Sequence, residues 1–96
     1  MQYADFNTAH CASFELSKAE YEALNPLWDA YNFAFDIIID EYEEEELPAR
    51  HVATALLMAR NALELSHDDV ERRGLTTLIE ALLLAQDHQT FVDLVF

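Results

Sequence analysis

Glycine, proline and cysteine are scarce in this chain of 96 residues, which contains one Gly, two Pro and one Cys. An all-β fold needs many turns, and turns depend on Gly and Pro, so the scarcity argues against that class. One cysteine cannot form a disulfide within the chain, which fits a reducing compartment. The single glycine also argues against the Gly-rich loops that cradle phosphates in nucleotide-binding proteins.

Basic residues are scarce as well. Five Lys and Arg stand against 19 Asp and Glu, which gives a net charge of −14. The imbalance is largest in residues 1–48, where Lys18 is the one basic residue among twelve acidic ones. Because phosphate binding requires clusters of Lys and Arg, nucleic acid and anionic membranes are poor direct partners. The more common role of acidity is to keep a protein soluble.

The sequence shows neither a signal peptide nor a membrane-spanning segment. The first ten residues, MQYADFNTAH, lack the basic and apolar regions of a secretion signal. No uncharged apolar run approaches the roughly 18 residues that a membrane-spanning helix needs. Together with the unpaired cysteine, these features lead us to expect a cytoplasmic protein.

The segment 26–43 predicts a central helix. Apolar side chains recur at steps of three or four, the spacing of one helix face: Trp28, Tyr31, Phe35, Ile38 and Tyr42. Polar side chains follow the same steps on another face: Asp29, Asn32, Asp36, Asp40 and Glu43. Asn25 is a suitable cap and Pro26 suits the first helical position. A buried strand over 33–39 is the alternative, and it fits less well because the helical spacing continues on both sides.

Two further main helices are expected at 49–65 and 75–90, each with an apolar face at helical spacing. A short helix over 18–24 follows the pattern Ser17-x-x-Glu20, which is typical of a helix start. Another short helix over 70–73 would end at Gly74 if that residue breaks the chain. The tail 91–96 is either a last helical turn or a strand against the region of Phe14.

We therefore expect an all-α fold. Residues 1–96 form a small single-domain helical bundle with three main helices and one or two short ones, and short extended segments are an option at the termini. Its core should contain the large apolar residues of the helical stripes: Trp28, Phe35, Ile38, Leu56, Leu63, Leu78 and Leu82.

No residue pattern predicts a metal site. Glu64-x-x-His67 has the spacing of half a carboxylate-bridged di-iron site, but such bundles need a second motif of this kind and two more Glu. His10 and Cys11 lack partners at zinc-binding spacing. We expect no metal and no cofactor.

Catalytic chemistry is not indicated either. His10 and Cys11 are adjacent in the chain, and adjacent side chains rarely face each other as a base and a nucleophile must. Asp36 and Asp40 would lie one turn apart on a helix and could share a proton, although a solvated pair is the more common situation on an acidic face. We expect a protein that is not an enzyme.

Two hypotheses for the function follow. In the first, the chain is an acidic interaction protein that binds a basic, nucleic-acid-binding surface of a partner protein, as nucleic-acid mimics and phage-encoded inhibitors of bacterial defence do. The predicted binding residues are Asp29, Asp36, Asp40, Glu43, Glu44, Glu45 and Glu46. In the second, the chain is a helical homodimer or structural subunit whose acidity serves solubility alone.

Overall fold

The computed structural model describes residues 4–6, 12–39 and 45–94 of the chain. They form the helices α1 (Lys18–Ala23), α2 (Asn25–Phe35), α3 (Val52–Leu65) and α4 (Asp69–His88), with a 3-10 turn, η1 (Ala49–His51), before α3. Four strands of three residues each complete the fold: β1 (Ala4–Phe6), β2 (Ala12–Phe14), β3 (Glu45–Leu47) and β4 (Val92–Leu94). The prediction of a small helical domain with three main helices is confirmed.

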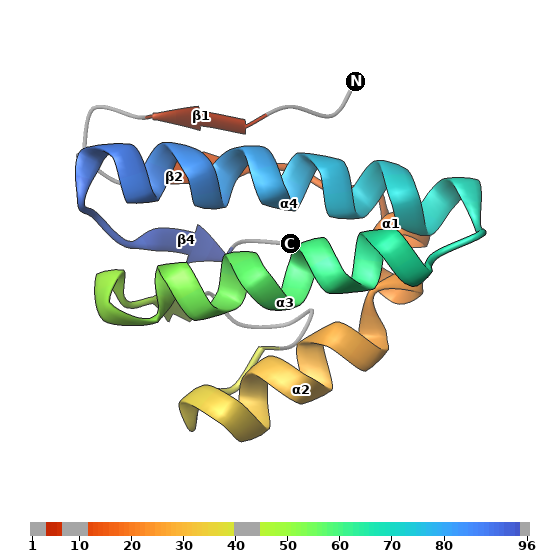
Figure 1. Ribbon diagram of the computed structural model, residues 1–96, viewed down its shortest axis with the longest axis horizontal. Helices are drawn as coiled ribbons and strands as arrows, with labels where there is room; N and C mark the ends of the chain where they lie inside the picture. Colours follow the sequence, from red (N-terminus) through yellow and green to blue (C-terminus); the bar gives the residue numbers. More distant parts are fainter. Residues whose placement is uncertain (1–3, 7–11, 40–44, 95–96) are drawn as a thin grey trace.

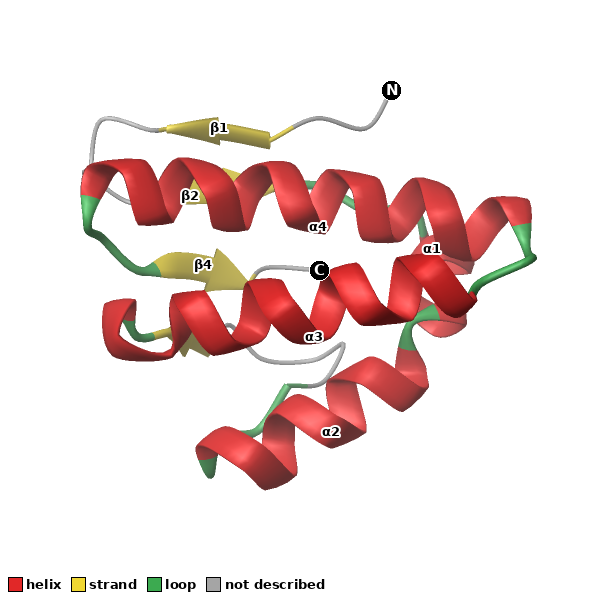
Figure 2. Ribbon diagram, in the orientation of Figure 1, coloured by secondary structure: helices red, strands yellow, loops and turns green. Residues whose placement is uncertain are grey.

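The helices and the strands form two layers (Figures 1 and 2). The sheet has the order β1-β2-β4-β3, and the parallel pair β2–β4 joins the two ends of the chain. Helix α4 packs on β1, β2 and β4, while α3 lies along α4 and α2 packs on α3. The extended segments left open for the termini are therefore present, and the tail pairs with Ala12 and Ser13 as a strand.

Helix α4 continues through Gly74, so this residue does not break the helix, a question that the sequence left open, and the segment 70–73 is part of α4. The helix begins one residue after Asp68, whose carboxylate accepts a hydrogen bond from the backbone N–H of Glu71 at 2.8 Å. A glycine inside a helix costs roughly 0.5–1 kcal/mol relative to alanine. At this position a Cβ atom would lie 3.3 Å from the side chains of both Glu20 on α1 and Leu24, the residue that follows this helix. Gly74 is thus the point where α1 approaches the backbone of α4 closely.

A ladder of aromatic rings attaches α2 to the rest of the molecule. Neighbouring ring centroids are 5.9 Å apart for Tyr21 and Trp28, 6.0 Å for Trp28 and Tyr31, and 5.4 Å for Tyr31 and Phe35. Phe35 then stacks on His51 at 4.6 Å. The Tyr31 hydroxyl donates a hydrogen bond of 2.6 Å to the carbonyl of Ala55 on α3, and burial raises the pKa of this phenol above its ordinary value. The ladder spans α1, α2 and η1.

Helix α2 ends at Phe35 rather than near residue 43, which corrects the predicted range. Asp36 takes a left-handed backbone conformation with φ 55° and ψ 47°, which Asp tolerates better than most residues. The side chain of Asn32 then accepts a hydrogen bond from the N–H of Ile39 at 2.7 Å. Three consecutive isoleucines favour helix poorly, and the following acidic run would meet the negative end of the helix dipole. Both effects favour an early end.

Burial largely agrees with the predicted core. Trp28, Phe35, Leu56, Leu78 and Leu82 are buried, and the partly buried Leu63 packs against them. The prediction that Ile38 belongs to the core is wrong, because 64% of its surface is exposed. The neighbouring Ile39 is buried instead. The early end of α2 causes this exchange, since helical spacing no longer applies after Asp36.

Candidate functional site

The outer face of α2 carries the start of the predicted acidic stripe. Asp29 and Asp36 are both exposed, and α2 contains no Lys or Arg. Between them lies Phe33, one helical turn after Asp29, with 93% of its surface exposed. The opposite side of the helix holds the aromatic ladder, so this face is free of core packing. It presents two carboxylates with an aromatic ring between them.

The rest of the stripe does not continue along this helix. Asp40, Glu43 and Glu44 lie outside the described residues, and Glu45 and Glu46 belong to strand β3. The seven predicted binding residues therefore do not share one rigid helical face. Proton sharing by Asp36 and Asp40, the less favoured interpretation of this pair, loses its basis because it required both residues on successive turns of a helix, and α2 ends at Phe35.

A second acidic arrangement comes from the sheet, and the sequence analysis missed it. The strand registers align Asp5 with Ser13, Ser13 with Asp93, and Asp93 with Glu46 in one row across all four strands. Asp93 is half-buried between the buried Val92 and Leu94, while Glu46 is exposed. Since neighbouring residues of a strand point to opposite faces, Asp93 points away from the core. The pairing of β3 with β4 thus brings two acidic residues from distant parts of the chain, Glu46 and Asp93, opposite each other.

The row has an energetic consequence. Asp93 and Glu46 are direct partners in the antiparallel pair of β3 and β4. Like charges directly opposite each other in a sheet are destabilising, typically by a few tenths of a kcal/mol. Alternation in the segments Glu46-Leu47 and Val92-Asp93-Leu94 was the available sequence signal, but three residues are too short to establish a period of two.

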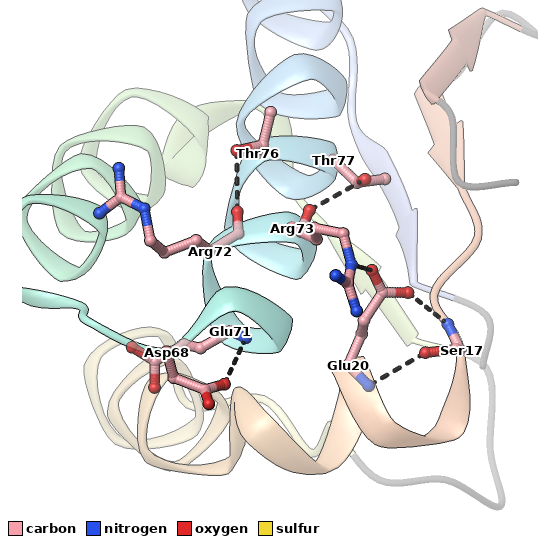
Figure 3. Close-up of polar contacts among 8 residues, drawn as sticks. All are labelled: Ser17, Glu20, Asp68, Glu71, Arg72, Arg73, Thr76 and Thr77. Atoms are coloured by element: carbon pink, nitrogen blue, oxygen red, sulfur yellow. Dashed lines mark hydrogen bonds and ion pairs between the residues drawn. The ribbon is translucent and has the colours of Figure 1, made fainter.

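The predicted helix start at Ser17 is confirmed, and it contains a buried carboxylate (Figure 3). The Ser17 hydroxyl accepts a hydrogen bond from the N–H of Glu20 at 3.1 Å, and Glu20 Oε1 accepts one from the N–H of Ser17 at 2.9 Å. The Glu20 side chain is 3% exposed, and its Oε2 lies 3.9 Å from Nε of Arg73 on α4. Among the residues that the structure describes, no hydrogen-bond donor reaches that oxygen. Glu20 and Arg73 therefore connect α1 to α4.

Arg72 is used inside the fold as well. Its guanidinium donates hydrogen bonds of 2.9 Å to the carbonyl of Leu63 and 3.0 Å to that of Ser66, at the end of α3. The hydroxyls of Thr76 and Thr77 donate to the carbonyls of Arg72 and Arg73 on their own helix (Figure 3). This neighbourhood has the composition of an anion site, but Arg72 already bonds the end of α3 and Arg73 already lies beside the carboxylate of Glu20.

One hollow among the described residues lies between several helices. An apolar hollow of about 200 Å³ lies between the α1–α2 junction, the end of α3 and the start of α4, and it includes Leu65 and Glu71. Typical ligand pockets measure about 300–1,000 Å³, so this hollow is small for a cofactor. The larger depressions beside α4 are lined by residues of that helix alone.

Metal ligands do not converge within the described ranges. No group of three or more His, Cys, Asp and Glu side chains is present in residues 4–6, 12–39 and 45–94. Glu64 at the end of α3 and His67 in the following loop are both exposed. His10 and Cys11 lie outside the described residues. Among the described helices, none has the length and apolar character needed to cross a membrane.

Comparisons with known proteins identify no relative: no match to the chain was found among protein-family models, curated proteins or solved structures. The sequence and the geometry above are therefore the basis for the function.

Proposed function

We propose that this chain is a non-enzymatic acidic interaction protein that binds a basic surface of a partner protein in the cytoplasm. The partner surfaces that fit best are those that bind nucleic acid, because they present Lys and Arg to a row of phosphates. The chain would then act as an inhibitor or a nucleic-acid mimic, of the kind that phages encode against their hosts. No direct nucleic-acid or membrane contact is part of this proposal.

The observation that supports it is the distribution of charge. The net charge is −14, and two of the five basic residues, Arg72 and Arg73, are engaged within the fold. The carboxylates Asp29, Asp36 and Glu46 are exposed. Such an uncompensated field attracts a positively charged surface and speeds association at low ionic strength.

The binding residues remain those predicted from the sequence, with a different geometry. Asp29 and Asp36 act from α2 and its end, and Glu45 and Glu46 act from strand β3. Asp40, Glu43 and Glu44 complete the set in the segment that connects these two elements. Asp93 joins the proposed surface because it pairs with Glu46 across the sheet.

The test starts from a partner obtained by affinity capture from the native host at low salt. In the purified complex, affinity should fall steeply with salt, and duplex DNA should compete if the partner surface binds nucleic acid. Replacing Asp29 and Asp36 together by Asn should lower the affinity about three- to tenfold at low salt. Asn suits position 36 because it tolerates the left-handed conformation observed there.

The control is the double change Glu80→Gln and Asp87→Asn on α4. Both residues are exposed, and they are separated by seven positions, as Asp29 and Asp36 are. Equal weakening by the two double changes would mean that the partner responds to total charge, and the proposed surface would be wrong.

The alternative is a helical homodimer or structural subunit, and the exposed Phe33 favours it to some extent. Apolar patches on a surface often mark contacts between protein chains. Sedimentation at several concentrations distinguishes the two: a dimer that persists at high salt, with no salt-dependent partner, would support the alternative.

A further inference from the structure

The most exposed large apolar side chain in the described part of the molecule is Phe33. Its exposed fraction is 93%, and Ile38, in the segment after α2, is exposed at 64%. The side-chain oxygen of Asn32 accepts a hydrogen bond from the N–H of Ile39 at 2.7 Å, and its side-chain nitrogen donates one to the carbonyl of Ile39 at 3.4 Å. The chain that carries Ile38 is thereby held at the same end of α2 as Phe33. Two large apolar side chains near the end of α2 are therefore largely exposed.

The charges around Phe33 set it apart from the exposed residues Leu57 and Leu83. Asp29 precedes it by one helical turn and Asp36 follows it by three residues, whereas Leu57 on α3 is 60% exposed and is followed three residues later by Arg60. Leu83 on α4 has Glu80 and Asp87 at comparable spacing, but it is an aliphatic residue and only 40% exposed. Phe33 combines an aromatic ring, nearly full exposure and a carboxylate on each side.

This combination indicates what kind of protein surface could bind the face of α2 around Phe33. A second copy of the chain would bring Asp29 and Asp36 against identical carboxylates, and like charges oppose such a contact. A surface with an apolar centre bordered by Lys or Arg would satisfy both groups, because the ring enters the apolar centre while the carboxylates meet the cations.

We infer that Phe33 is the aromatic anchor of the partner-binding surface, inserted into an apolar centre that Lys or Arg residues of another protein surround. The inference rests on the proposed function and adds the apolar half of the recognition. Aromatic residues at the centre of an interface commonly contribute most of the affinity, while surrounding charges contribute mainly to the rate of association and to specificity. Asp29 and Asp36 therefore guide the partner, and Phe33 retains it.

Two synthetic helical peptides of equal length and Lys content serve as probes. One carries Leu and the other Ala on the face opposite the lysines, and Ala keeps the helix while removing most of the apolar contact. The wild-type chain should bind the Lys–Leu peptide more tightly than the Lys–Ala peptide. Phe33→Ser should weaken binding of the Lys–Leu peptide about tenfold and leave binding of the Lys–Ala peptide unchanged.

Matched variants separate this inference from the proposed function. Leu83→Ser and Leu57→Ser should each change binding of either peptide by less than about twofold. The double change of Asp29 and Asp36 to Asn should weaken both peptides. If the aspartate variant weakens binding and Phe33→Ser does not, the anchor is wrong and the acidic surface stands. If the aspartate variant has no effect, the acidic surface itself is wrong, and the anchor with it.

Self-association is the remaining outcome. Sedimentation of the wild type and of Phe33→Ser at the same concentration shows whether the ring holds two copies together. A wild-type dimer that becomes monomeric on this substitution would overturn the inference, because the occupant would then be a second copy of the chain. A monomer in both cases is the expected result.

Discussion

Helices α2 and α4 are both amphipathic, yet they contribute differently to the molecule. Helix α4 has 20 residues, starts at a capping carboxylate and buries residues against α1, α3 and the sheet. Helix α2 has 11 residues, lacks a side-chain cap at its start and packs mainly through one aromatic side on α3. The comparison shows that α4 organises the core, while α2 exposes a face that the core does not need.

The difference reverses the order of importance expected from the sequence. The segment 26–43 has the greatest aromatic content, but its helix stops at Phe35 and leaves Phe33 in solvent. The segment after Asp68, which contains the only glycine, forms the longest described helix. Position relative to neighbouring elements, rather than apolar content, determines which helix is central.

The largest loss of stability should come from shortening a buried side chain on the inner face of α4. Leu82 is fully buried, so Leu82→Ala should reduce the free energy of unfolding by about 2–5 kcal/mol, from lost burial and the cavity left behind. Leu83→Ala on the same helix, where the side chain is partly exposed, is the control and should cost much less. Denaturant unfolding measures both. Equal losses would mean that α4 does not have the distinct inner face described above.

A smaller loss of stability is expected from adding a side chain at Gly74, where α1 lies close to the backbone of α4. In Gly74→Val, the added side chain would meet Glu20 and Leu24, whose atoms lie 3.3 Å from the position of a Cβ. Forcing this contact apart should lower the free energy of unfolding by about 1–3 kcal/mol, against a helix-propensity gain of a few tenths. Gln86→Val, at an exposed position of α4, provides the control. A stabilised Gly74→Val protein would contradict the close approach of the two helices.

On the inner side of α2, Tyr31→Phe tests the attachment to α3. Loss of the hydrogen bond to the Ala55 carbonyl should cost about 0.5–1.5 kcal/mol at neutral pH. Burial raises the pKa of Tyr31 above 10.0, so the folded state holds this proton more tightly than the unfolded state. The resulting stability is present below pH 10 and is lost as pH rises further, by at most about 1.4 kcal/mol per pH unit.

Melting temperatures between pH 9 and pH 11 measure this dependence. The wild type should lose stability more steeply than Tyr31→Phe over the range, because the variant lacks the buried phenol. Parallel curves would show that the Tyr31 hydroxyl is not protected from solvent as the structure indicates.

The smallest effect should come from the outer side of α2. Phe33→Ser removes a side chain that is 93% exposed, so the free energy of unfolding should change by no more than about 0.5 kcal/mol. Thermal and denaturant unfolding check this result, which the binding experiments also require. A loss above about 2 kcal/mol would place Phe33 in the core and remove the contrast between the two faces of α2.

The sequence predicted those elements whose spacing persists over several turns. The helices around Leu56 and Leu82 and the start at Ser17 were recognised, because repeated spacing and the Ser-x-x-Glu pattern are local signals. The end of α2 was missed because Ile38 continues the helical spacing by one further step. The chain reversal at Asp36 depends on a backbone conformation and a bond from Asn32, which spacing does not reveal.

Contacts between residues far apart in the chain could not be predicted from residue spacing. The sequence left open whether Gly74 breaks the helix, because the benefit of this glycine comes from its contact with Glu20 and Leu24, far earlier in the chain. The row that aligns Asp93 with Glu46 depends on strand pairing between distant segments. For the candidate site, the sequence indicated the carboxylates, and only the structure separated Phe33 from the other aromatic residues of α2 as the exposed one.

The position of Trp28 makes the molecule its own optical reporter. This residue is the only tryptophan in the chain, it is buried, and its indole N–H donates a hydrogen bond of 2.9 Å to the carbonyl of Tyr21. Its ring stacks on that of Tyr21 and lies tilted beside that of Tyr31, so the fluorescence and near-ultraviolet dichroism of one indole monitor the junction of α1 and α2. A red shift of its emission signals separation of these helices without any attached dye. Because Phe33 lies on the opposite side of α2, occupation of that face should leave the emission unshifted.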